Sequence, residues 1–221
     1  MRFSPVPRTV LFDLDGTLTN SGPGIIGSLK KALARMNYPE PAPDVLRKFI
    51  GPPMFGSLVS FCGMTPSQAE EAVCFYREIY NRTGVYENEV YPGIPELLDR
   101  LRESGAKLAV ATTKPALAAA KVLGHFGLAS RFDFVSAADE SERESSKKGL
   151  ILTALQELDC PPERAVMVGD TKFDAGGARD AGTDFVGVLY GFGTREEMER
   201  EGARKFVPDV SGLRKMLIDK A

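Results

Sequence analysis

The chain has 221 residues, of which 26% are charged, and its formal net charge at pH 7 is −2. This length can bury a real core as one large or two small domains. The balanced charge argues against a nucleic-acid binder, which usually carries a basic surplus, and no apolar run approaches the ~18 residues of a membrane span. The first eight residues lack the apolar stretch of a signal peptide, and the three cysteines match no zinc or disulfide spacing. We therefore expect a cytoplasmic protein that binds neither nucleic acid nor membranes.

The first predicted element is a strand at Thr9–Phe12, an apolar run of strand formers that ends in Asp13-Leu14-Asp15-Gly16-Thr17. From residue 19 to residue 90 the pattern is helical, is interrupted by glycine and proline, and contains no convincing strand. One helix in this stretch begins at Thr65-Pro66-Ser67-Gln68, which is a capping-box signature. We predict that residues 19–90 form an all-helical cap domain.

From residue 91 onward, predicted helices alternate with short apolar strands. The strands are expected at residues 107–111, 132–136, 165–168 and 185–189, with a short extended pair at 206–207. Such alternation indicates a parallel sheet with helices on both faces. The strand at residues 9–12 must join this sheet across the helical insertion. Residues 1–18 and 91–221 are therefore predicted to form one Rossmann-like α/β core.

Polar side chains follow several of these strands. Asp13 and Asp15 follow the first strand, Thr112 and Thr113 the second, and Asp170 the fourth, while Lys147 begins the helix after the third. Ligands of open parallel sheets bind at the carboxyl ends of the strands, so these residues are expected to meet at one rim.

This set of residue types suits phosphoryl transfer. Three carboxylates around one point call for a hard divalent cation such as Mg²⁺, and threonine hydroxyls and a lysine can hold phosphoryl oxygens. His125 is the single histidine, so the chain can build neither a histidine-based metal site nor a Ser-His-Asp triad. A carboxylate is then the natural nucleophile and gives an aspartyl-phosphate.

The sequence resembles the haloacid dehalogenase-like (HAD) hydrolase superfamily in four motifs, whose order and spacing match Asp13-Leu14-Asp15-Gly16-Thr17, Thr112, Lys147 and Gly169-Asp170-Thr171-Lys172-Phe173-Asp174. It is most similar to the phosphoglycolate phosphatase-like branch, which has an inserted helical cap and includes relatives called 5′-nucleotidases. The segments that carry this closer likeness are Gly51-Pro52-Pro53-Met54, the Gly169–Asp174 motif itself and Tyr190-Gly191-Phe192-Gly193.

The resemblance implies a role for each matching residue. Asp13 is expected to be the nucleophile and a Mg²⁺ ligand, and Asp15 to transfer protons and to touch the metal through its backbone carbonyl. Thr112 is expected to bind a phosphoryl oxygen. Its neighbour Thr113, which the strand pattern places at the same rim, is a second candidate for phosphate contact, or its hydroxyl is satisfied by the backbone at the strand end. Lys147 is expected to neutralise phosphoryl charge. Asp170 is expected to be the second carboxylate on Mg²⁺, and Asp174 to hold a metal-bound water. Gly51, Pro52 and Met54 are expected to form a loop that reaches the substrate.

The resemblance thus implies a phosphatase acting on a small phosphorylated metabolite, either phosphoglycolate-like or a nucleoside 5′-monophosphate. A β-phosphoglucomutase-like sugar phosphomutase is the enzymatic alternative, and a phospho-accepting signalling module is the non-enzymatic one. Lys148 competes with Lys147 as the motif lysine. The Gly51–Met54 segment also fits a plain turn between helices, and the protein is expected to be a monomer or a homodimer.

Overall fold

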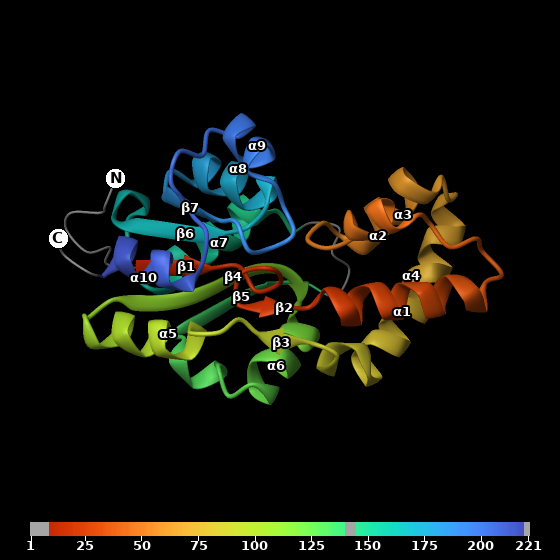
Figure 1. The fold of residues 1–221 in the computed structure, drawn as a ribbon, viewed down its shortest axis with the longest axis horizontal. Coiled ribbons are helices and arrows are strands. Elements are labelled where there is room, and N and C mark those ends of the chain that lie inside the picture. Colours follow the sequence, from red (N-terminus) through yellow and green to blue (C-terminus); the bar gives the residue numbers. More distant parts are fainter. Residues whose placement is uncertain (1–8, 140–144, 219–221) are drawn as a thin grey trace.

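The computed structural model describes residues 9–139 and 145–218, and its centre is a six-stranded sheet in which every neighbouring pair is parallel (Figure 1). The strand order is β5-β4-β1-β6-β7-β8, so β1 lies in the middle of the sheet. The strands are β1 (Thr9–Phe12), β4 (Lys107–Pro115), β5 (Phe134–Ala138), β6 (Ala165–Gly169), β7 (Asp184–Val188) and β8 (Phe206–Val207). The predicted Rossmann-like α/β fold is confirmed.

Helices cover both faces of this sheet, because alternate strand residues point to opposite sides. On β1, Val10 and Phe12 pack into one core cluster and Leu11 into another. Figure 1 shows α5 and α6 on one side and α7, α8 and α9 on the other. The core helices are α5 (Ile94–Glu103), α6 (Ala116–His125), α7 (Lys147–Glu157), α8 (Lys172–Ala181), α9 (Arg195–Arg200) and α10 (Val210–Leu217). Single 3-10 turns occur at Gly84–Tyr86, Ala129–Arg131 and Pro162–Arg164.

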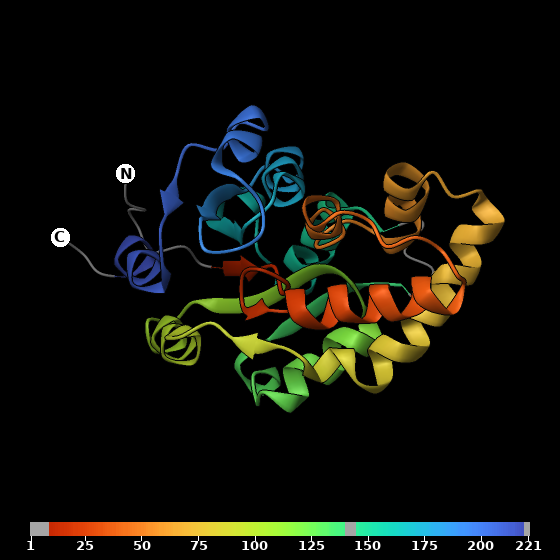
Figure 2. The same ribbon diagram turned by 45° about the vertical axis from the view of Figure 1, so that its right-hand side comes forward.

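Four of the five helices between β1 and β4 gather beyond one end of the sheet (Figures 1 and 2). We call them the cap helices, and they are α1 (Gly22–Arg35), α2 (Pro43–Arg47), α3 (Met54–Cys62) and α4 (Pro66–Arg82). The predicted capping box is present at the start of α4. The backbone N–H of Gln68 donates to Thr65 Oγ1 at 3.3 Å, and the backbone N–H of Thr65 donates to Gln68 Oε1 at 3.0 Å.

Two short strands lie where the chain enters and leaves the cap helices. β2 (Thr19–Asn20) pairs antiparallel with β3 (Glu89–Val90), and Tyr91 N donates to Leu18 O at 3.1 Å. The prediction that residues 19–90 contain no strand was therefore wrong. Each strand has only two residues, and its partner lies about 70 positions away, so neither has a local periodic signal.

The second core strand is longer than predicted. We expected Thr112 and Thr113 to follow the strand, but β4 continues to Pro115. Its register with β5 shifts after Thr112, so that Thr112 pairs with Ala137 and Pro115 with Ala138. A bulge of this kind bends a strand and redirects its side chains. Within the part of the chain that the structure describes, no helix is long and apolar enough to cross a bilayer.

Candidate active site

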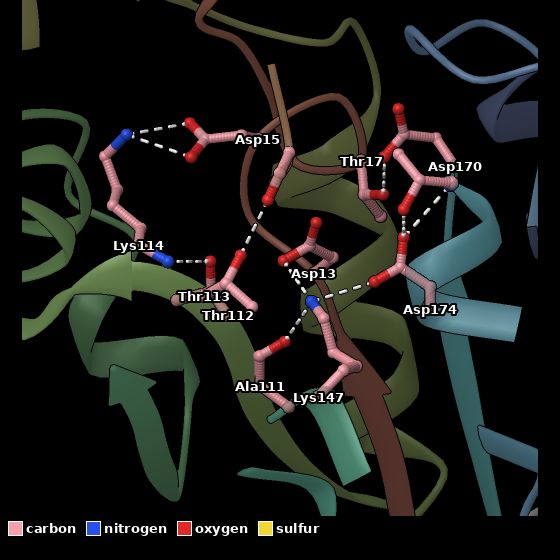
Figure 3. A network of polar contacts seen from close by, with 12 residues as sticks. Asp13, Asp15, Thr17, Ala111, Thr112, Thr113, Lys114, Lys147, Asp170 and Asp174 are labelled. Atoms are coloured by element: carbon pink, nitrogen blue, oxygen red, sulfur yellow. Dashed lines mark hydrogen bonds and ion pairs between the residues drawn. The ribbon is translucent and has the colours of Figure 1, made fainter. Parts of the chain in front are cut away.

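Asp13 lies directly beyond β1, at the carboxyl end of the central strand. Its backbone N–H donates to Val168 O at 2.9 Å, which extends the pairing with β6 by one residue. Lys147, the first residue of α7, donates from Nζ to Asp13 Oδ1 at 2.8 Å and to Ala111 O at 3.0 Å (Figure 3). Lys148 is exposed. Of the two candidate lysines, the structure brings Lys147 to Asp13.

Two further carboxylates approach Asp13 from the segment after β6. Asp170 is fully buried; its Oδ1 accepts from Thr17 Oγ1 at 3.1 Å and its Oδ2 from Phe192 N at 2.8 Å. Asp174 Oδ1 forms an ion pair with Lys147 Nζ at 2.8 Å. Asp13, Asp170 and Asp174 each place one carboxylate oxygen within 4.8 Å of the others.

The Asp174 carboxylate also caps the N-terminus of α8. Its Oδ2 accepts from Thr171 N at 3.0 Å and from Thr171 Oγ1 at 2.7 Å. An acid in the first turn of a helix is favoured by the macrodipole. Asp174 therefore has a local structural task as well as its place in the acidic cluster.

Glycines allow the backbone to fold closely around Asp170. Gly16 has φ +85°, and a Cβ there would lie 2.2 Å from Asp170 Oδ2. A Cβ at Gly191 would lie 2.4 Å from the same oxygen. The Asp13-Leu14-Asp15-Gly16 turn and the 190–193 segment can enclose the carboxylate only because neither position has a side chain.

The acidic cluster carries more negative charge than its lysine balances. Burial raises the pKa of Asp13 to about 6; Lys147 lowers it, and the charges of Asp174 and Asp15 raise it. Burial, with Asp174 and Asp13, raises the pKa of Asp170 well above its usual value. Burial alone would lower the pKa of Lys147, but Asp13 and Asp174 raise it above its ordinary value. Three ionised carboxylates with one ammonium leave a local charge of −2, so the donor set fits a hard divalent cation.

Asp15 faces away from this cluster and pairs with a residue that the sequence reasoning missed. Lys114 Nζ donates to Asp15 Oδ1 at 3.0 Å and to Oδ2 at 2.9 Å, and both side chains are almost buried. The same ammonium lies 4.7 Å from the ring centroid of Tyr80, on cap helix α4. Asp13 and Asp15 thus have separate cations, although only one residue separates them in the chain.

Thr112 and Thr113 both lie at this site, but they have different partners. The buried Thr112 Oγ1 accepts from Lys114 N at 3.2 Å. Thr113 Oγ1 donates to Gly51 O at 2.9 Å, which joins the core to the loop before α3. Gly51 has φ +107°, a backbone conformation that favours glycine.

A small cavity lies between Asp15 and the cap helices, with a volume of about 60 Å³. The predicted substrate loop lines it through Gly51, Pro52 and Met54. Thr113 and Lys114 line it from the core, and α4 lines it from the cap side through residues that include Tyr80. The loop thus lies over the acid and base candidate Asp15.

Several neighbours of the acidic cluster carried little signal in the sequence. Tyr190 donates through its hydroxyl to Thr17 O at 3.0 Å, and Phe192 acts through its backbone N–H. A backbone donor leaves no trace in residue type. Lys114 did carry a signal, because a lysine two residues after Thr112 at the end of an apolar strand is a costly group to bury without a partner.

The family model for haloacid dehalogenase-like hydrolases matches residues 10–188. A 5′-nucleotidase from Pseudomonas aeruginosa is 38% identical over 208 residues, which cover 94% of each chain. The tyrosine-protein kinase PtkA from Mycobacterium tuberculosis is 40% identical over 88% of this chain and 66% of its own length. A phosphoglycolate phosphatase from Aquifex aeolicus is 33% identical over 84% of this chain and 86% of its own.

Solved structures also include proteins with a similar fold. The crystal structure of a predicted phosphatase from Clostridium acetobutylicum superposes with a TM-score of 0.90 at 37% identity and covers 95% of this chain and 97% of its own. The matched residues run from β1 through β7 and include each carboxylate of the acidic cluster. The chain therefore belongs to the haloacid dehalogenase-like hydrolase family, as an enzyme of its phosphatase branch.

Proposed function

We propose that this enzyme is a Mg²⁺-dependent phosphatase that hydrolyses a small phosphomonoester through an aspartyl-phosphate on Asp13. The observation that carries the proposal is the separation of two neighbouring carboxylates. Asp13 contacts Lys147 beside the acidic cluster, whereas Asp15 contacts Lys114 beside the cavity. Two carboxylates in different environments can divide nucleophilic attack and proton transfer between them.

In the first step, an Asp13 carboxylate oxygen attacks phosphorus and the bond from phosphorus to the ester oxygen breaks. Asp15 gives a proton to the departing ester oxygen, which leaves as an alcohol. In the second step, Asp15 takes a proton from a water that attacks the phosphoryl group, which frees Asp13 and releases inorganic phosphate. In this proposal Lys147, which contacts Asp13, and the buried Thr112 hydroxyl would stabilise the phosphoryl oxygens.

The acidic cluster is the proposed metal site. Asp13, Asp170 and the backbone carbonyl of Asp15 would hold Mg²⁺, with Asp174 on a metal-bound water. When bound, the ion supplies positive charge that neutralises the phosphoryl oxygens and keeps Asp13 ionised. The −2 charge left by three carboxylates and Lys147 supports this assignment.

The test measures phosphate release from an aryl phosphate with Mg²⁺, for the wild type and for Asp13→Asn. The variant keeps the size of the side chain but removes the nucleophilic charge, so we expect no turnover above the uncatalysed rate. Asp159→Asn is the matched control, because Asp159 is exposed at φ +48°, a conformation that asparagine adopts readily. Turnover by Asp13→Asn, or full wild-type activity in excess EDTA, would refute the proposal.

Transfer to an acceptor other than water is the second candidate. A kinase transfers a phosphoryl group to a protein side chain, and one relative of this chain is named as a tyrosine-protein kinase. A phosphomutase transfers the group to a sugar hydroxyl. The two outcomes differ in product. If the enzyme is a hydrolase, inorganic phosphate accounts for all of the substrate consumed, with no isomerised sugar phosphate and no phosphorylated peptide.

A further inference from the structure

The proposed reaction gives no task to Lys114, although its ammonium is buried at the active site (Figure 3). The Lys114 side chain is 4% exposed and that of Asp15 is 11% exposed. The ammonium donates to both carboxylate oxygens of Asp15, at 3.0 and 2.9 Å. A buried ion pair adds little stability compared with apolar side chains of similar volume. The pair therefore serves something other than the stability of the fold.

The bulge in β4 brings Lys114 to this position. Between Thr112 and Pro115, β4 gains two residues relative to its neighbour β5, and Lys114 is one of them. The backbone N–H of Lys114 donates to Thr112 Oγ1 at 3.2 Å, which stabilises the irregular backbone. Bulges are common beside active sites, where they redirect a side chain. Here the redirected side chain reaches the turn that follows β1.

The backbone around Asp15 is fixed, whereas its side chain needs a partner to hold it. Gly16 N donates to Thr19 O at 2.8 Å, and Asp15 forms an isolated bridge with Thr19. The carboxylate can still rotate about two side-chain bonds. Because Lys114 holds both carboxylate oxygens, this rotation is restricted, and Asp15 stays where it lines the cavity. Tyr80 on α4 contacts the same ammonium from the cap side, with its ring centroid 4.7 Å from Nζ.

We propose that Lys114 is a positioning residue for proton transfer by Asp15. This role rests on the proposed function, in which Asp15 protonates the departing ester oxygen. As the proton moves to that oxygen, the bond from phosphorus to the oxygen breaks and Asp15 is left as a carboxylate. The Lys114 ammonium is already in place to stabilise this carboxylate, and it keeps its own protons throughout. The ion pair is the arrangement between the two steps, before Asp15 takes a proton from water.

Substrates should therefore differ in how much they depend on Lys114. The ester oxygen of phenyl phosphate needs a proton as it departs, whereas that of dinitrophenyl phosphate departs as a stable anion. Positioned proton transfer contributes about 10²- to 10⁴-fold to a rate. For Lys114→Met we expect kcat/KM to fall about 10- to 100-fold further with phenyl phosphate than with dinitrophenyl phosphate. A role in packing alone would lower kcat/KM for both esters by the same factor.

The test measures kcat/KM for the two esters in saturating Mg²⁺, because kcat/KM includes only the steps up to departure of the phenol. Lys107→Met is the matched control. It removes the other lysine of β4, which donates to Leu158 O at 2.8 Å from the opposite end of the strand. The ratio of kcat/KM between the two esters should stay at its wild-type value in this control.

A double substitution keeps the test decisive if the unpaired Asp15 carboxylate stops Lys114→Met from folding. The protein with Asp15→Asn and Lys114→Met has neither charge of the buried pair, and it is compared with Asp15→Asn alone. If Lys114 acts through Asp15, the added Lys114→Met change should leave the ratio between the esters unaltered.

The proposal is overturned if Lys114→Met lowers kcat/KM for both esters equally, if Lys107→Met changes the ratio as much as Lys114→Met does, or if Lys114→Met changes the ratio further in the Asp15→Asn protein. Each of these outcomes leaves the phosphatase activity itself intact. Failure of the proposed function looks different, because then neither ester is hydrolysed in an Asp13-dependent way.

Discussion

Replacing Lys147 with methionine tests whether the acidic cluster depends on this single ammonium. The ammonium contacts Asp13 and Asp174 at 2.8 Å each, and all three side chains are at least 94% buried. Methionine fills a similar volume, so the change removes charge without leaving a large void. Removing one partner of a buried ion pair costs about 3–5 kcal/mol, because the other charge stays buried and uncompensated. At ~2–4 °C per kcal/mol for a chain of this size, the expected fall in Tm is about 6–20 °C.

The assay is thermal unfolding followed by circular dichroism at pH 8 in EDTA. Lys148→Met is the matched control; because Lys148 is exposed, its effect should stay within ~0.5 kcal/mol. Added Mg²⁺ should narrow the gap between wild type and Lys147→Met, since a divalent cation replaces part of the lost positive charge. Equal Tm values for the two variants would refute the idea that Lys147 balances the cluster.

Two further predictions concern the same cluster. Gly177→Ala places a Cβ 2.5 Å from Lys147 Cγ, so α8 must shift from α7 or Lys147 must move; we expect a loss of about 1–3 kcal/mol in urea unfolding together with lower kcat. Gly176→Ala, one residue earlier, meets only the ends of the Glu201 and Arg179 side chains and should be neutral or stabilising. A Gly177→Ala enzyme as active and stable as Gly176→Ala would contradict the packing argument. The second prediction concerns the dependence of stability on pH. Folding raises the pKa of Asp13 from 3.8 to about 6, so the folded protein binds the Asp13 proton more tightly than the unfolded chain does. The stability that this proton contributes is fully present below pH 3.8 and is lost as the pH rises through about 6. In EDTA, the urea midpoint of the wild type should therefore fall more steeply between pH 4 and pH 6.5 than that of Asp13→Asn. Parallel plots of midpoint against pH for the two proteins would contradict this prediction.

The sequence was sufficient to predict the fold because its strands are buried on both faces. Such strands are continuous apolar runs, as at Thr9–Phe12 and Ala165–Gly169, and their ends are easily located. Because parallel strands share one carboxyl edge, locating the ends also brought Asp13 and Asp170 together. Lys147 could be assigned to the same edge of the sheet because it is the first residue of α7, the helix that follows β5.

Contacts between side chains that are far apart in the chain could not be predicted from the sequence in this way. The link between Lys114 and Asp15 spans 99 positions, and it needs the bulge in β4, whose register cannot be read from residue types. The cap side of the cavity was hidden for a similar reason. Tyr80 occupies a buried position on an amphipathic helix, where an aromatic residue is usually part of the core. Only the packed structure shows that Tyr80 lines a cavity.

The paired strands β2 and β3 determine how the cap helices can move. The chain passes between the sheet and the cap helices twice, and the two passages are hydrogen-bonded to each other, with Asn88 Nδ2 also donating to Thr19 Oγ1 at 3.2 Å. Two separate tethers would leave the cap helices freer to slide and twist than a hydrogen-bonded pair of strands does. Any rotation of the cap helices about this pair would have to break the hydrogen bond from Thr113 Oγ1 to Gly51 O, which joins the core to the loop before α3.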